Sequence, residues 1–105
     1  MNNTPSAIQE LPLHDAIVRE ILVGWVEKRV TLELSAFLLP KANAKPCTLV
    51  FEGVTSTEIP HQSPWGESAS INKVWSENGV FKIEMQSGDV LKVMASSYGF
   101  HENAL

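Results

Sequence analysis

The amino-acid sequence predicts an all-β domain, a small sandwich or partly open barrel of six or seven antiparallel strands with little or no helix. Three observations support this fold class. Apolar and polar residues alternate with period two through much of residues 16–38, as in strands with one buried face. Asn78-Gly79 lies between two further strand-like runs and is a strong hairpin signal. The length, 105 residues, suits one domain (1–105) with a single core.

The first hairpin is predicted over residues 16–38, with its turn at Val26–Arg29. Glu27-Lys28 is not a residue pair that tight turns favour, so the hydrophobic register supports this hairpin more strongly than the turn residues do. A helix over residues 16–26 is the alternative, but the β-branched residues and Gly24 favour a strand. The predicted register buries six apolar side chains on one face, in the opposing pairs Trp25–Val30, Val23–Leu32 and Ile21–Leu34.

A third strand is predicted over Cys47–Val54, after a proline-bounded loop at Pro40–Pro46. The central residues of this strand are apolar on both faces, which suggests a strand that is covered on both sides. Residues 55–70 form the longest irregular segment, because their two prolines are incompatible with a helix or a central strand.

The last third of the chain predicts a three-stranded meander over Ile71–Glu77, Val80–Met85 and Val90–Ser97. The two reversals lie at Asn78-Gly79 and at residues 86–89. One face of the meander is then apolar, and we expect it to pack on the core. The other face carries opposed charges and a cation–π contact, in the pairs Lys73–Glu84, Glu84–Lys92 and Trp75–Lys82. On the apolar face, Met85, Ile83 and Phe81 are expected opposite Leu91, Val93 and Ala95.

Composition excludes several classes of partner. The formal net charge is -4, and the eight basic residues are scattered, so no nucleic-acid partner is predicted. No apolar stretch approaches the ~18 residues of a membrane helix, so no membrane partner is predicted either. Residues 1–12 resemble a loosely ordered arm, with one helical turn at 7–11, rather than a signal peptide. The β domain is therefore expected over residues 13–100, in a cytoplasmic protein without an intramolecular disulfide.

Seven residues are candidates for a binding site. His14-Asp15 precedes the first strand and could tune a base or bind a metal, but adjacent residues of an extended chain point in opposite directions. Trp65 lies on a rigid Pro- and Gly-flanked loop, and either anchors a partner or plugs one end of the fold. The candidates are His14, Asp15, Trp65, Glu67, Trp75, Lys82 and Glu84.

No motif indicates a catalytic residue, a metal or a cofactor. The spacings of the three histidines match no metal-ligand motif, and the glycines form no phosphate-binding motif. Cys47 has no charged neighbour in the sequence that would lower its pKa, so a structural thiol is expected. The enzymatic alternative is a small metal-dependent hydrolase that uses His14, Asp15, His61 and Glu67 around one pocket.

Four short segments resemble a loose group of small β-rich bacterial proteins without assigned activity, some of which are immunity proteins of polymorphic toxin systems. The likeness spans roughly residues 11–97. It lies in Leu13-His14-Asp15-Ala16, Leu49–Val54, Pro64–Ser68 and Ile83–Asp89. The resemblance implies an acidic protein that acts by binding and has no catalytic residues.

These observations favour a non-enzymatic binding protein, with an immunity-type inhibitor that occludes a basic toxin site as the specific hypothesis. The acidic balance supports a protein partner with a basic surface, because opposite charge speeds encounter. A further alternative is an assembly role, in which an exposed sheet edge pairs in a homodimer.

Overall fold

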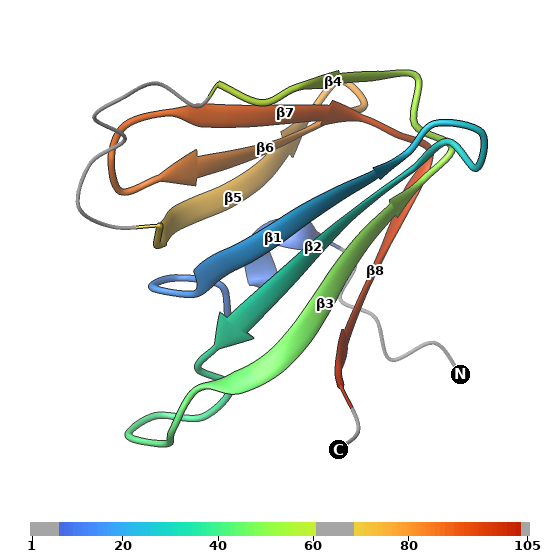
Figure 1. Cartoon of the computed structure of the whole chain (residues 1–105). Helices are drawn as coiled ribbons and strands as arrows, with labels where there is room; N and C mark the ends of the chain where they lie inside the picture. Colours follow the sequence, from blue (N-terminus) through green and yellow to red (C-terminus); the bar gives the residue numbers. More distant parts are fainter. Residues whose placement is uncertain (1–6, 61–68, 104–105) are drawn as a thin grey trace.

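Two antiparallel sheets of four strands each pack face to face in a computed structural model that describes residues 7–60 and 69–103 (Figure 1). The all-β fold class is confirmed, and the described residues form no closed barrel. Sheet A has the order β1-β2-β3-β8 and sheet B the order β4-β7-β6-β5. The strands are β1 (Ile17–Gly24), β2 (Arg29–Ala36), β3 (Lys45–Glu52), β4 (Ser56–Glu58), β5 (Ile71–Glu77), β6 (Val80–Met85), β7 (Val90–Met94) and β8 (Ser97–Glu102).

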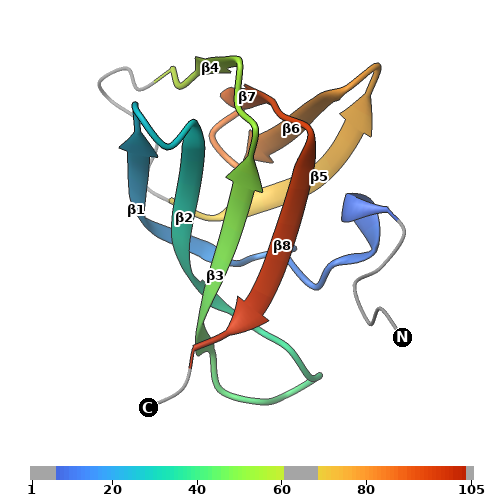
Figure 2. The same ribbon diagram turned by 90° about the vertical axis from the view of Figure 1, so that its right-hand side faces the viewer.

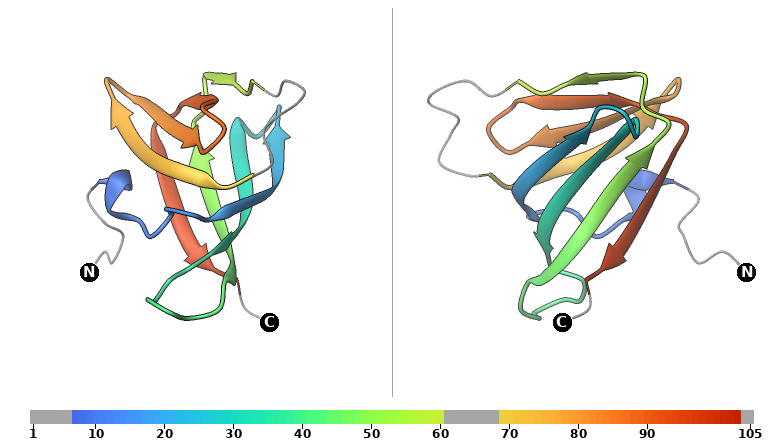
Figure 3. Two further views of the ribbon diagram at one scale, coloured as in Figure 1. Left: turned by 90° about the vertical axis from the view of Figure 1, so that its left-hand side faces the viewer. Right: turned by 45° about the vertical axis from the view of Figure 1, so that its right-hand side comes forward.

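The sheets cross rather than align. Figure 2 shows sheet B lying over one end of sheet A, with β5 running across the direction of β3 and β8. Both views of Figure 3 show the same crossing. Such packing leaves part of sheet A uncovered and joins the sheets at corners. At one corner, the backbone of residues 15–18 pairs with that of residues 69–71, through an isolated bridge between Ile17 and Ser70.

The first hairpin forms, but its turn is at Trp25–Lys28 rather than at Val26–Arg29. Val23 pairs with Val30 and Ile21 with Leu32, two residues away from the predicted register. Lys28 adopts a positive φ of 56°, which closes the turn one residue earlier. The prediction of six buried side chains is wrong for two of them: Trp25 lies in the turn and is 88% exposed, and Val23 is 50% exposed.

The Asn78-Gly79 hairpin is confirmed in every predicted pair, including Trp75 with Lys82 and Lys73 with Glu84. Asn78 and Gly79 have φ angles of 52° and 80°, as a type I′ turn requires. The strand before this turn carries a bulge at Asn72, between the pairs formed by Ile71 and Lys73. A bulge re-aims the backbone of one residue, and this one turns the carbonyl of Asn72 toward His14.

The register of β6 with β7 differs by two residues from the prediction. Glu84 lies opposite Val90 instead of Lys92, and Lys92 lies opposite Lys82. The predicted ionic row across three strands is therefore wrong beyond its first pair. Gly88, with a φ of 101°, closes a three-residue loop in which the Met85 amide donates to the Asp89 carbonyl at 2.8 Å. This loop is shorter than the one the prediction assumed.

The two ends of the described chain contribute more than the sequence predicted. The turn expected at residues 7–11 forms as a 3-10 helix, η1 (Ile8–Glu10), but Ile8 and Leu11 are buried against the core rather than loosely held. Strand β8 was not expected beyond Ser97, and it raises the number of strands in the described part of the chain to eight. In both segments the apolar residues are few, so packing against other elements stabilises them. η1 packs against β5, and β8 packs against β3 and, through Tyr98, against Phe81 of β6.

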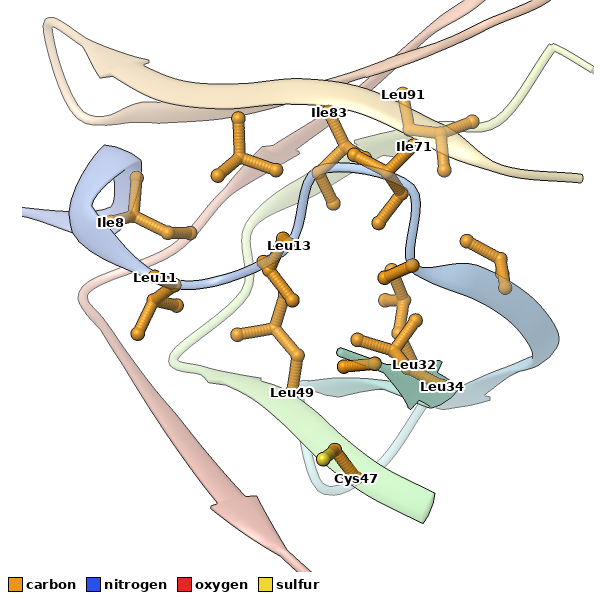
Figure 4. Packing of buried hydrophobic residues seen from close by; sticks show 14 of the residues in the cluster. Ile8, Leu11, Leu13, Leu32, Leu34, Cys47, Leu49, Ile71, Ile83 and Leu91 are labelled. Atoms are coloured by element: carbon orange, nitrogen blue, oxygen red, sulfur yellow. The ribbon is translucent and has the colours of Figure 1, made fainter. Parts of the chain in front are cut away.

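The core lies between the inner faces of the two sheets. Phe51 of β3 is fully buried, and its ring centroid is 5.1 Å from that of Phe81 on β6. Leu13, from the segment that follows η1, inserts beside Leu49 and beneath the residues of sheet B (Figure 4). Side chains of the N-terminal segment thus fill space that the crossed sheets leave between them.

The change Phe51→Ala is expected to lower the free energy of unfolding by about 3–5 kcal/mol, because it opens a cavity where the two sheets meet. Chemical denaturation measures this loss. Phe37→Ala is the matched control, since the Phe37 side chain is exposed and its removal should cost less than about 1 kcal/mol. Similar losses for the two variants would contradict the placement of Phe51.

The change Gly53→Ala is expected to be more destabilising than Gly79→Ala, although both glycines have positive φ. At Gly79 a Cβ meets no atom, so only the backbone cost of about 1–2 kcal/mol applies. At Gly53 a Cβ would overlap the hydroxyl of Ser96, which donates to the Glu52 carbonyl at 3.1 Å. Denaturation midpoints test the order, and equal losses would contradict it. Gly99→Ala is the neutral reference, because its φ is not positive and its Cβ makes an ordinary contact.

Candidate functional site

A hollow of about 400 Å³ opens between the N-terminal segment and edge strand β5, and we call it the β5 hollow. Its floor is apolar, because Leu11, Leu13 and Val74 are all buried. Its rim is polar and aromatic. The complete lining is Gln9, Leu11, Leu13, His14, Asn72, Lys73, Val74 and Trp75.

His14 lies on the rim and is held by the bulge of β5. Its Nδ1 is 2.8 Å from the carbonyl oxygen of Asn72. A carbonyl only accepts, so Nδ1 donates this hydrogen bond. The bulge at Asn72 turns this carbonyl toward the N-terminal segment, which orients the ring of His14.

Asp15 approaches His14, contrary to the expectation for neighbours on an extended chain. The His14 Nε2 and the Asp15 Oδ1 are 3.6 Å apart. The reason is local: Asp15 has a φ of 69°, so the chain turns here instead of running straight. Its carboxylate also accepts from Gln86 Nε2 at 2.6 Å, and its amide donates to the Ile71 carbonyl at 2.8 Å. Asp15 therefore ties together three segments at the corner between the sheets.

Trp75 forms a half-buried wall of the hollow. The ammonium of Lys73 lies 5.2 Å from the centroid of its ring, within the range of a cation–π interaction. The prediction gave this role to Lys82, and that prediction is wrong. The ammonium of Lys82 instead donates to Glu77 Oε1 at 2.7 Å, because Glu77 lies two residues from Trp75 on the same face of β5.

Glu84 joins the charged groups beside the hollow. It accepts from Asn72 Nδ2 at 3.1 Å, and the Lys73 ammonium is 4.0 Å away. The outer face of sheet B thus presents alternating charge around Trp75. The groups of this face are Lys73, Trp75, Glu77, Lys82 and Glu84.

Two of the seven predicted site residues, His14 and Trp75, line the β5 hollow. Asp15 lies beside His14, and Lys82 and Glu84 lie on β6, the neighbour of β5 in sheet B. Trp65 and Glu67, with His61 of the enzymatic alternative, lie outside the described residues. The sequence did not predict that Asn72 would bind His14, or that Gln9 of η1 would line the hollow. A bulge has no signal in the sequence pattern, and the few apolar residues of 7–13 gave no periodicity.

The pKa values of Glu77 and Cys47 are shifted by their surroundings. The hydrogen bond from Lys82 lowers the pKa of the exposed Glu77 below its ordinary value, and a bond from the Trp75 indole at 3.4 Å adds to this effect. Burial raises the pKa of the Cys47 thiol, and the negative charge of Glu102 raises it further. A thiol of this kind is a poor nucleophile, in agreement with the structural role expected for Cys47.

Within residues 7–60 and 69–103, no cluster of three or more His, Cys, Asp or Glu side chains could hold a metal ion. The same part of the chain contains no helix with the length and apolar character needed to cross a membrane.

Comparisons with protein families, with curated proteins and with solved structures found no match for this chain. The likeness to immunity proteins therefore stays a prediction.

Glu77 is expected to titrate below 4.5, the ordinary glutamate pKa, and Lys82→Met should raise its pKa toward 4.5. A lowered carboxyl pKa stabilises the fold above the ordinary pKa, and this contribution disappears as the pH falls through the lowered value. NMR titration of the Glu77 side chain measures both values. Lys45→Met, on the far strand β3, is the control and should leave the Glu77 pKa unchanged. An equal pKa in the wild type and in Lys82→Met would contradict the pairing.

Proposed function

We propose that this chain is a non-enzymatic binding protein that engages another protein at the β5 hollow. The observation that carries the proposal is the combination of a buried apolar floor with Trp75 on an open strand edge. Hollows of this kind accept an apolar or aromatic side chain, and tryptophan is common among the residues that dominate interface energy.

The open edge of β5 supports an extended partner segment. β5 is the terminal strand of sheet B, and among the described residues no strand pairs with Lys73–Glu77 on the side away from β6. Its first residues are already paired with residues 15–17 at the corner. A partner strand added beyond this corner would satisfy the free backbone groups and place one side chain over the hollow.

The charges around the hollow favour a basic partner. Glu77 neutralises Lys82, and Glu84 neutralises Lys73, so the two ammonium groups are already paired. Asp15 adds a further carboxylate on the same side, and the whole chain carries a net charge of -4. A partner with Lys or Arg around an apolar anchor is complementary to this surface. An inhibitor that occludes a basic toxin site is the form of this function that we propose.

The hydrolase alternative gains no support from the contacts of its described members. The Nδ1 of His14 is engaged by a backbone carbonyl, and the carboxylate of Asp15 is engaged by Gln86. Both contacts stabilise the corner between the two sheets, so they have a structural role.

The proposal is tested by capture of partners from the native cell extract at low salt on immobilised wild type, Trp75→Ala and Trp25→Ala. A partner that binds through the β5 hollow is expected on the wild type and on Trp25→Ala, and to be lost from Trp75→Ala. Calorimetry with the purified partner should show affinity at least about 30-fold weaker for Trp75→Ala, as for a tryptophan hot spot of about 2 kcal/mol.

Trp25→Ala is the matched control because it removes an exposed tryptophan from the β1–β2 turn, away from the hollow. Circular dichroism establishes that both variants fold. Lys73→Gln provides a second variant at the rim, which perturbs the contact to Trp75 without opening a cavity. Retention of every partner by Trp75→Ala and Lys73→Gln, or capture of none by the wild type, would contradict the proposal.

A further inference from the structure

A second hollow, of about 470 Å³, opens at the end of the sandwich where the β1–β2 turn lies beside β4, and we call it the β4 hollow. It is lined by residues 23–25 and 28–30 of the first hairpin and by residues 54–57, which lead into β4. Figure 2 shows β4 above the turn that joins β1 to β2. The β4 hollow shares no lining residue with the β5 hollow, and its volume is within the range of about 300–1,000 Å³ that is typical of small-molecule sites.

The inner part of the β4 hollow is apolar, because it lies between the inner faces of the two sheets. Val23 and Val30 lie opposite each other on β1 and β2, so their side chains share one face, and Val30 is fully buried in the core. Val54, which follows β3, is half-buried and packs against the same core. Val23 belongs to this inner face and is still 50% exposed, since the hollow leaves its side chain open to solvent.

Thr57 brings a hydroxyl to this apolar interior. It lies opposite Val93, which is buried in the core, so the Thr57 side chain is on the inner face of sheet B. Thr57 is half-buried, and its hydroxyl makes no hydrogen bond to another described residue. Burial of a polar group without a partner is unfavourable, so this hydroxyl is available to a ligand. Thr55 and Ser56 line the same wall and are exposed.

The charged residues of the lining are both positive. Lys28 and Arg29 line the β4 hollow and no acidic residue does, although the whole chain has twelve acidic and eight basic residues. Arg29 is already engaged by Glu52, at 3.1 Å. The Glu27 carboxylate lies against Gly24 on the outer face of β1 and does not line the hollow. Lys28 forms no ion pair with another described residue, so its ammonium is the charge available to a ligand.

The two walls of the β4 hollow are joined by the backbone, so the site exists before a ligand binds. The Val54 amide donates to the Lys28 carbonyl at 2.9 Å, and the Thr55 amide donates to the Met94 carbonyl of β7 at 2.9 Å. These bonds connect the first hairpin to residues 54–55 and those residues to sheet B. A preformed site loses little conformational entropy on binding, which favours affinity for a small ligand.

We propose that the β4 hollow binds a small amphipathic carboxylate. Its apolar body lies against Val23, Val30 and Val54, and the exposed indole of Trp25 covers it from the mouth of the hollow. The Lys28 ammonium and the hydroxyls of residues 55–57 supply the charge and the donors for the carboxylate. A single available ammonium matches a single negative charge, so a carboxylate is favoured over a doubly charged phosphate.

Titration of the full chain with octanoate, followed by amide NMR, tests the proposal. Saturable shift changes are expected at Val23, at Val54 and at the Trp25 indole, and none at Leu13 or Val74 of the β5 hollow. Octanoate should bind at least about fivefold more tightly than hexanoate, because two more methylene groups are removed from water. Octylammonium has the same chain with the opposite charge, and it should bind at least about tenfold more weakly than octanoate.

Two variants test the polar contacts. Lys28→Asn should weaken octanoate binding by at least about fivefold, and asparagine tolerates the φ of 56° at this position. Lys41→Asn is the matched control and should bind octanoate as the wild type does, because Lys41 is also exposed, has a φ of 63° and does not line the hollow. Thr57→Val keeps the shape of the side chain without its hydroxyl and should weaken binding by about threefold or more.

The proposal is overturned if millimolar octanoate causes no shift changes, or changes only at the β5 hollow. Equal binding of octanoate and octylammonium would overturn it as well, as would an octanoate affinity that is the same in Lys28→Asn and in Lys41→Asn. None of these results depends on capture of a protein partner through Trp75, so the proposed function is tested separately.

Discussion

The contact between Phe51 and Phe81 is the interaction on which the remaining structure depends. Phe51 belongs to sheet A and Phe81 to sheet B, and Tyr98 packs edge-on against Phe81 with ring centroids 5.5 Å apart. Each sheet has one apolar face that must be removed from water, and neither sheet could be stable alone. The three rings hold the two faces together where the strands cross. The corners and the N-terminal segment then close the space that crossed sheets leave open.

Crossed packing also explains why the chain has two contrasting edges. The edge of β5 is lined by η1 and by the turn at Asp15, which together create a hollow with an apolar floor and a charged rim. The edge strand β1 has apolar side chains in solvent, with Leu22 and Val23 about half exposed. A small sandwich without a closed barrel cannot satisfy every strand edge internally.

Much of the candidate site could be predicted from the sequence, because Trp75, Lys82 and Glu84 follow from a hairpin whose turn is unambiguous. The meeting of His14 with Asp15 could not be predicted, since it depends on a positive φ that only the corner between the sheets imposes. The same is true of Asn72, whose bulge presents a carbonyl to His14. Local pattern identifies which faces are polar, but distant segments decide which polar groups meet.

The sequence by itself determined the fold class and the buried face of most strands, because side chains alternate with period two and this period is visible in the order of residues. It also determined the register at Asn78-Gly79, where both turn residues readily adopt positive φ. Only the tertiary structure decided the registers of β1 with β2 and of β6 with β7. The register of β6 with β7, and that of β1 with β2 from Glu20 onward, differ from the prediction by two residues, and a shift of two leaves these side chains on the same face. At the start of β1 a bulge at Arg19 adds one further residue of shift, so Val18 rather than Ile17 is buried. Burial therefore cannot choose between such registers, and the choice depends on the backbone conformations of Lys28 and Gly88 in the closing turns.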